Sequence, residues 1–256
     1  MDAYVVTGAG RGVGRAIAER LLANGAYIVI VERDASALDW TREHPAAARL
    51  GGVAGDAADQ AVARQAADLA QEAGTLAGWV NNAAVFRDAW LHATPARDVL
   101  DLIAANLGLA VTGCATAVGR FLDAGTPGAI VNVSSHQAQR PVRGALPYAT
   151  AKAAIEGLTR ALAVDYGPRG IRSNAVALGS ITTPRYDALL AGEDRAAAAR
   201  IEDQVRELHP LGRPGSVAEA AAAVAYLLSP DASFVNGVIL AVDGGRGVLG
   251  LDPEQA

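Results

Sequence analysis

The sequence is poor in the residues that form disulfides and metal sites. It has one cysteine, Cys114, which cannot close an intramolecular disulfide, and four histidines whose spacing matches no metal-binding motif. It also lacks an uncharged apolar run of about 18 residues and a basic segment or cleavage site near Met1. We therefore expect no structural metal, no membrane span and a cytoplasmic location.

Lysine is almost missing as well. The 22 basic residues are 21 arginines and the single Lys152. Where arginine fills nearly every cationic position, a surviving lysine indicates a site that needs a compact ammonium rather than a planar guanidinium. The net charge is -5 and the basic residues do not cluster, so we expect neither nucleic acid nor an anionic membrane as a partner.

Short apolar segments alternate with longer helical ones along the whole chain. The predicted strands are 3–6, 27–31, 52–54, 78–80, 129–133, 173–176 and 238–242, and the predicted helices are 12–24, 35–43, 58–73, 96–123, 148–167 and 216–228. This alternation predicts an α/β protein with one doubly wound parallel sheet, a Rossmann fold with helices on both faces. No linker or repeat divides the chain, so we expect one domain over 1–256.

The segment 184–212 departs from this alternation. It follows a strand, opens with Thr183-Pro184 and carries a polar, alanine-rich helix from Arg195 to Leu208. Insertions at the carboxyl end of a strand often cover a ligand, so we predict a small helical lid. An ordinary surface helix is the alternative.

A glycine-rich turn, Thr7 to Gly14, joins the first strand to the first helix. Glycines let the backbone approach a pyrophosphate, which the free N–H groups of the helix stabilise. A tight turn without a ligand would use the same residues, but the flanking strand and helix favour a dinucleotide site. The residues that we assign to it are Gly8, Arg11, Gly12, Val13 and Gly14.

An acidic residue, Glu32, ends the second predicted strand. A carboxylate there accepts hydrogen bonds from the adenosine ribose and repels a 2′-phosphate, which favours NAD over NADP. The neighbouring Arg33 could pair with such a phosphate, but the charge of Glu32 opposes it. We predict NAD as the cofactor, with an NADP-dependent ketoreductase as the alternative.

Tyr148 and Lys152 lie four residues apart on a helix that begins near Pro147. With one lysine and six tyrosines, chance gives this spacing only about 2% of the time. A positive charge about 4 Å from a phenol lowers its pKa by up to about three units at an effective dielectric constant of 20. We therefore expect Lys152 to bring the pKa of Tyr148 close to neutrality, so that the phenol can exchange protons with a substrate.

Taken together, the motifs resemble those of the short-chain dehydrogenase/reductase family. The resemblance extends to Asp243-Gly244-Gly245, near the end of the chain. The matching segments are TGxxxGxG at 7–14, Asn81-Asn82-Ala83, Ser134-Ser135 and YxxxK at 148–152. It implies that Ser135 binds the substrate oxygen, that Tyr148 transfers the proton, and that Lys152 holds the cofactor ribose. On the residues alone, a hydroxyl at a strand end is well placed to stabilise alkoxide charge, or to cap a turn.

The same resemblance implies roles for other positions. Asn106 would be the fourth active-site residue, kinking its helix around a proton-relaying water, although a plain exposed asparagine is the alternative. The implied cofactor contacts are Asp56 and Ala57 beside the adenine, Asn82 and Ala83 on the adenosine side, and Ile181 and Thr183 at the nicotinamide carboxamide. Asp56 could equally be a turn residue. Two positions near the cofactor depart from the family pattern: Leu178 replaces a proline and Ala84 replaces a glycine.

These observations predict an NAD(H)-dependent oxidoreductase that interconverts a secondary alcohol and a ketone. A non-catalytic NAD-sensing regulator or scaffold is the alternative from another class, whereas a methyltransferase would leave YxxxK unexplained. Helix 148–167 is apolar over most of its circumference, and the resemblance implies a homotetramer that buries it. Polar residues near the site fit a polar or acidic substrate, or point to solvent or a neighbouring subunit: His136, Gln137, Arg140, Arg143, Arg185 and Tyr186.

Overall fold

Seven parallel strands form one central sheet in the computed structural model, which describes residues 1–250. The last six residues of the predicted domain, 251–256, lie outside the described residues. The strands are β1 (Asp2–Thr7), β2 (Tyr27–Glu32), β3 (Leu50–Ala54), β4 (Thr75–Asn81), β5 (Gly128–Ser135), β6 (Ile171–Leu178) and β9 (Ile239–Val242). All seven predicted strands are confirmed, with boundaries that differ by a few residues.

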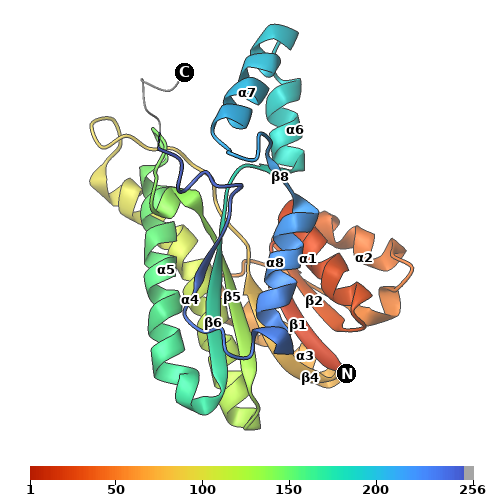
Figure 1. Cartoon of the computed structure of the whole chain (residues 1–256). Helices are drawn as coiled ribbons and strands as arrows, with labels where there is room; N and C mark the ends of the chain where they lie inside the picture. The colour runs from red at the N-terminus through yellow and green to blue at the C-terminus, as the bar shows by residue number, and fades with distance from the viewer. Residues whose placement is uncertain (251–256) are drawn as a thin grey trace.

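The strand order is β3-β2-β1-β4-β5-β6-β9, with helices on both faces (Figure 1). The predicted doubly wound Rossmann fold is therefore confirmed. From β1 the chain continues to β2 and β3 on one side of the sheet, and from β4 it continues to β5 and β6 on the other side. The direction of the strand order therefore reverses between β1 and β4. In open parallel sheets, ligands bind at the carboxyl ends of the strands beside such a reversal.

The helices divide into two layers, each with its own apolar core. On one face, α1 (Gly12–Ala23) packs on α8 (Val217–Leu228). On the other lie α3 (Gln60–Ala73), α4 (Ala96–Ala124) and α5 (Leu146–Tyr166). Successive strand residues serve opposite cores: Ile28 and Ile30 contact the first, and Val29 the second. Each such fully buried side chain contributes about 1.5–3 kcal/mol.

The predicted helix 35–43 is wrong in part. It is a short 3-10 turn, Ala35–Leu38, followed by α2 (Asp39–Glu43). The Asp34 carboxylate accepts a hydrogen bond from the backbone N–H of Ser36 at 3.0 Å, which favours a tight turn at that point.

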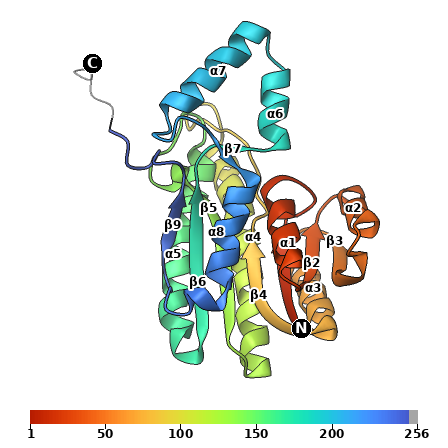
Figure 2. The ribbon, with the colours of Figure 1, turned by 45° about the vertical axis from the view of Figure 1, so that its right-hand side comes forward.

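The predicted insertion 184–212 contains two helices rather than one, α6 (Pro184–Ala191) and α7 (Arg195–Glu207). They stand beyond the carboxyl ends of the sheet strands (Figures 1 and 2). Thr183 caps α6 and Pro184 occupies its first turn, so the Thr183-Pro184 pair begins a helix. The two ends of the insertion are tied together where β7 (Ile181–Thr182) pairs with β8 (Gly215–Ser216).

Helix α4 is, by length and composition, the one helix within residues 1–250 that could cross a membrane. It packs against α3, α5, β4 and β5. The core helix of a layered domain satisfies the same criterion, so its apolar character follows from its place in the fold.

Candidate active site

The glycine-rich turn follows the end of β1 and packs tightly against Asn82 and Ala83, directly after β4. Gly8 and Gly12 adopt positive φ values of 65° and 57°, which favour glycine. A Cβ at Gly14 would lie 2.2 Å from the carbonyl oxygen of Gly8 and 2.5 Å from Nδ2 of Asn82. Any side chain at Gly14 would therefore push α1 away from this turn.

The first turn of α1 keeps its backbone N–H groups free of side chains. Arg11 at the N-cap makes no capping hydrogen bond, and the first turn has no acidic residue. A side chain caps each of α3, α6, α7 and α8, whereas α2, α4 and α5 have no side-chain cap, like α1. Uncapped N–H groups at a helix start, beside glycines that let a ligand approach, fit the pyrophosphate of a dinucleotide.

Asn82 and Ala83 hold the glycine-rich turn in place. Asn82 Nδ2 donates to the carbonyl oxygens of Thr7 at 3.0 Å and Gly8 at 2.9 Å. The backbone N–H groups of Asn82 and Ala83 donate to Thr7 Oγ1 at 3.0 and 3.1 Å. These contacts give both residues a supporting function that the sequence did not reveal.

The Glu32 carboxylate is fixed beside the same turn. Oε2 accepts the N–H of Gly10 at 3.1 Å, and Oε1 accepts the N–H of Arg33 at 2.9 Å. Two backbone donors therefore hold the carboxylate at the end of β2, while the Arg33 side chain is exposed. These hydrogen bonds oppose a displacement of the Glu32 carboxylate that would let Arg33 bind a 2′-phosphate in its place.

Asp56 lies in the loop after β3, where its Oδ1 accepts the N–H of Ala58 at 2.9 Å. It thus forms the turn that the sequence offered as the alternative to adenine contact. Its neighbour Ala57 is buried in the second core.

Ser135, Tyr148 and Lys152 come together where β5 ends and α5 begins. Lys152 Nζ donates to the carbonyl oxygen of Val133 at 2.6 Å and lies 5.4 Å from the centre of the Tyr148 ring. Ser135 Oγ accepts the N–H of Gln137 at 3.2 Å, so it also caps the short turn after β5. The three side chains share the carboxyl edge of the sheet.

We expected Lys152 to bring the pKa of Tyr148 close to neutrality. For the protein chain without a cofactor, this expectation is wrong. Burial raises the pKa of Tyr148 to about 12, although a hydrogen bond with Ser135 and the charge of Arg185 both act to lower it. Desolvation outweighs these effects because it disfavours the phenolate. The Lys152 ammonium donates to Val133 and lies over the face of the phenol ring.

The pKa of Lys152 is shifted as well. It is 3% exposed, and burial lowers its pKa to about 8. An ammonium has three donors, and among the described residues Lys152 has one hydrogen-bond acceptor, Val133. A buried ammonium with donors to spare fits the hydroxyls of a nicotinamide ribose.

Asn106 is buried in α4, so the exposed alternative is wrong. Its Oδ1 accepts the N–H of Val85 at 2.9 Å, and its Nδ2 donates to the carbonyl oxygens of Val85 at 2.9 Å and Leu102 at 3.3 Å. The amide thus holds the loop after β4 against α4.

Thr183 lies close to the glycine-rich turn, although the two are far apart in the sequence. Its Cβ and Cγ2 lie 3.8 Å from the position of a Cβ at Gly12. Thr183 Oγ1 also accepts the N–H of Tyr186 at 3.3 Å, which caps α6. Ile181 lies in β7, directly before it. Leu178, which replaces the family's proline, extends β6 and pairs with Ser135 and Val242.

Some polar contacts near the site were missed by the sequence interpretation. Asn81 Nδ2 donates to Asn132 Oδ1 at 2.8 Å, and Asn132 Nδ2 donates to Thr159 Oγ1 at 2.9 Å. Ser134 Oγ donates to the buried Glu156 at 3.1 Å. These bonds connect β4, β5 and α5. The available signal was the presence of polar residues within otherwise apolar strands.

A second missed feature is an aromatic and cationic stack on Tyr148. The Phe86 ring lies 5.0 Å from that of Tyr148, centre to centre, at an angle of 31°. The guanidinium carbon of Arg185 lies 3.9 Å from the centre of the Phe86 ring. The stack connects the loop after β4, the start of α5 and the first turn of α6.

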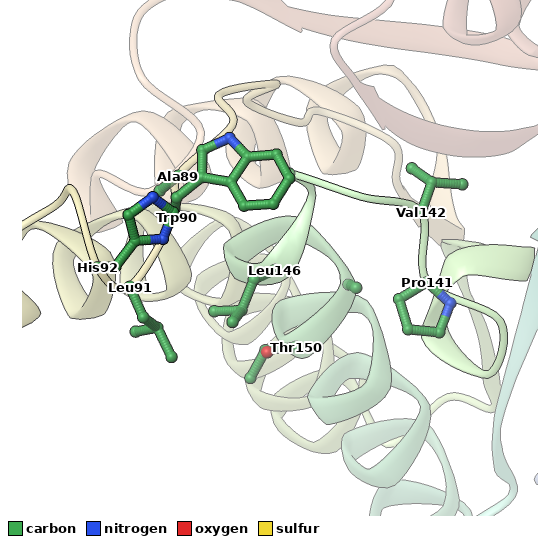
Figure 3. A pocket seen from close by; sticks show the side chains of 10 residues that line it. Ala89, Trp90, Leu91, His92, Pro141, Val142, Leu146 and Thr150 are labelled. Atoms are coloured by element: carbon green, nitrogen blue, oxygen red, sulfur yellow. The ribbon is translucent and has the colours of Figure 1, made fainter.

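An apolar pocket of about 440 Å³ lies next to the start of α5 (Figure 3). Figure 3 shows Trp90 on one side, Pro141 and Val142 on the other, and Leu146 and Thr150 of α5 between them. Neither Ser135 nor Tyr148 lines this pocket. It is therefore separate from the cluster of candidate catalytic residues.

Comparison with known proteins gives matches over almost the entire chain. A family model described as Enoyl-(Acyl carrier protein) reductase matches residues 8–246. Short-chain reductase protein NovJ of Streptomyces niveus is 37% identical over 247 residues, 94% of this chain and 92% of that protein. Gluconate 5-dehydrogenase of Gluconobacter oxydans is 34% identical over 244 residues, 94% and 93% of the two chains. A crystal structure of an actinorhodin polyketide ketoreductase variant with NADPH matches with a TM-score of 0.87 and 26% identity, covering 97% of this chain and 98% of that chain.

Proposed function

Because the chain belongs to the short-chain dehydrogenase/reductase family, we propose that it is an NAD(H)-dependent enzyme that interconverts a secondary alcohol and a ketone. The observation that carries the proposal is the meeting of Ser135, Tyr148 and Lys152 at the carboxyl edge of the sheet. The relatives named above are reductases and dehydrogenases, which agrees with oxidoreductase chemistry.

In this proposal the protein holds the substrate oxygen and moves one proton. Ser135 donates a hydrogen bond to the carbonyl oxygen, and the Tyr148 hydroxyl delivers the proton in reduction or accepts it in oxidation. Lys152 stays buried, anchored to Val133, with its remaining donors directed to the cofactor ribose. When bound, the nicotinamide supplies or accepts the hydride.

The proposed cofactor is NAD(H), held by the glycine-rich turn, Glu32 and the segment of Ile181 and Thr183. The fixed position of the Glu32 carboxylate supports NAD, because a 2′-phosphate would meet its negative charge. The related ketoreductase crystallised with NADPH keeps an NADP-dependent enzyme as the alternative.

Replacing Glu32 by alanine should reverse the proposed preference for NAD over NADP. We expect kcat/KM for NAD to fall by about tenfold or more, because the ribose loses its acceptor, while kcat/KM for NADP rises because the repulsion is removed. Steady-state kinetics with both cofactors would measure it, with exposed Glu43→Ala on α2 as the control. A wild-type enzyme with the higher kcat/KM for NADP would refute the proposed cofactor.

We propose that 184–212 acts as a lid within a single domain. Its two helices extend beyond the sheet, and Thr183, at the start of the segment, reaches the glycine-rich turn. The β7 and β8 pairing holds both ends of the segment near the site.

We also propose a homo-oligomer, with a tetramer as the expected state. One face of α5 is exposed and built mainly from small residues: Thr150, Ala153, Gly157, Ala161 and Val164. Val164 is 75% exposed, and Trp90 and Leu91 beside the pocket are 50% and 65% exposed. A second copy of the chain would cover these apolar groups.

Gly157→Arg should therefore dissociate the oligomer. A Cβ at Gly157 meets no atom within 4 Å in the isolated chain, and arginine favours a helix more than glycine, so the fold should be retained. Light scattering coupled to size-exclusion chromatography should show a smaller particle, with the exposed Asp165→Arg as the control. An unchanged mass for Gly157→Arg would exclude this face as the interface.

A further inference from the structure

We propose that the substrate carries a carboxylate, and that Arg185 on the lid binds it. This inference rests on the proposed alcohol and ketone chemistry and adds the substrate class. It follows from the position of Arg185 beside the candidate catalytic residues, from the absence of an ion pair for Arg185 among residues 1–250, and from the charge of a second arginine, Arg246, on His136.

Arg185 stacks on the ring of Phe86, next to Tyr148. Its guanidinium lies 3.9 Å from the centre of the Phe86 ring, and Phe86 lies 5.0 Å from the Tyr148 ring. Stacking fixes the plane of the guanidinium and leaves its edge N–H groups free to donate. The charge of Arg185 also acts to lower the pKa of Tyr148.

No carboxylate compensates this charge within the described part of the chain. The arginines that form ion pairs there are Arg15, Arg42, Arg97, Arg120, Arg206 and Arg213. Arg185 is solvent-exposed, and its stacking on Phe86 leaves its donors available beside Tyr148.

A second arginine, Arg246, lies near His136, the residue after Ser135. Arg246 is half-buried, and its Nη1 donates to Ser180 Oγ at 2.8 Å. The nearby Asp243 accepts the N–H groups of Gly245 and Gly247 at 3.0 and 2.7 Å, and its charge also acts on Arg246. The charge of Arg246 acts on His136, whose Nδ1 lies 3.3 Å from Ser135 Oγ, so a second positive charge lies near the serine.

A carboxylate is the group that this arrangement suits best. A planar guanidinium donates two parallel hydrogen bonds to the two oxygens of a carboxylate. A neutral ketone lacks the charge and the paired oxygens that accept these two hydrogen bonds.

Matched pairs of substrates test the proposal. The probes are 3-hydroxybutyrate against its methyl ester for oxidation, and 4-oxopentanoate against its methyl ester for reduction. We expect wild-type kcat/KM to favour each acid by about tenfold or more. Arg185→Gln should lower kcat/KM for the acids about 10- to 100-fold, mainly through KM, and leave the esters within about threefold. Arg185→Lys should restore only part of the loss, and Arg200→Gln, on the same lid, should change neither.

Two results would overturn the inference. One is a wild-type enzyme that prefers the esters. The other is an equal loss on acid and ester in Arg185→Gln, which would make Arg185 a contact that only holds the lid on Phe86. Saturation-transfer NMR with NADH present gives a readout independent of turnover: binding of 4-oxopentanoate, and not of its ester, should weaken in Arg185→Gln. Failure of the proposed function gives a different result, namely NADH binding without turnover of acid or ester.

Discussion

Replacing Tyr148 by phenylalanine should lower kcat by about 10²-fold or more while leaving NADH binding almost unchanged. The substitution removes one oxygen and keeps the ring that stacks on Phe86. Because Lys152 is anchored to Val133 and not to the phenol, its position should also be retained. Stopped-flow kinetics and calorimetry with NADH would measure the two quantities separately.

The pH dependence of catalysis tests the protonation state of Tyr148. Burial raises the pKa of Tyr148 to about 12, so the phenol stays protonated through neutral pH and is ready to donate in reduction. Alcohol oxidation requires the phenolate, whose fraction rises about tenfold per pH unit below the pKa, so kcat/KM for oxidation should increase with pH up to about 8, where Lys152 begins to lose its charge. Tyr166→Phe, at the far end of α5, is the matched control. Wild-type turnover in Tyr148→Phe would remove the tyrosine from the mechanism.

Lys152→Met should abolish most activity and yet stabilise the fold. Activity should fall by about 10²-fold or more, because the cofactor ribose loses its ammonium partner. The lowered pKa of Lys152, about 8 against an ordinary 10.5, means that the folded protein binds this proton more weakly than the unfolded chain does. The burial cost is fully present below about pH 8 and disappears as the pH rises through 10.5.

Chemical denaturation at several pH values tests this second prediction. Methionine fills a similar volume without charge, so the free energy of unfolding should rise at neutral pH by up to about 3 kcal/mol. The gain should vanish in alkaline solution. Arg160→Met, exposed on the same helix, should show no such pattern. A Lys152→Met variant less stable than wild type at neutral pH would show that Lys152 supports the fold.

The layered architecture was predictable because apolar periodicity and glycine positions are local signals. Val29 and its neighbours in β2 mark a strand buried on both faces, and Gly8, Gly12 and Gly14 mark the turn that follows β1. The YxxxK spacing likewise places Tyr148 and Lys152 on one side of α5 by helix geometry alone.

Energies and contacts that depend on tertiary packing were not predictable in this way. The spacing of Tyr148 and Lys152 says nothing about how deeply the phenol is buried, and burial decides the direction of its pKa shift. The stack of Arg185 on Phe86 joins residues about a hundred positions apart, with no pattern to connect them. The hydrogen bonds between Asn106 and the Val85 backbone also arise only when α4 meets the loop after β4.

The most direct test of the account is the fate of the hydride itself. The wild-type protein would be incubated with NADH carrying deuterium at nicotinamide C4 and with 4-oxopentanoate or its methyl ester, and the products analysed by mass spectrometry and NMR. We predict deuterium on the carbinol carbon of the product, and its loss in Tyr148→Phe. Tight NADH binding without deuterium in any alcohol product would contradict the oxidoreductase assignment and favour a regulator that binds the cofactor without turnover.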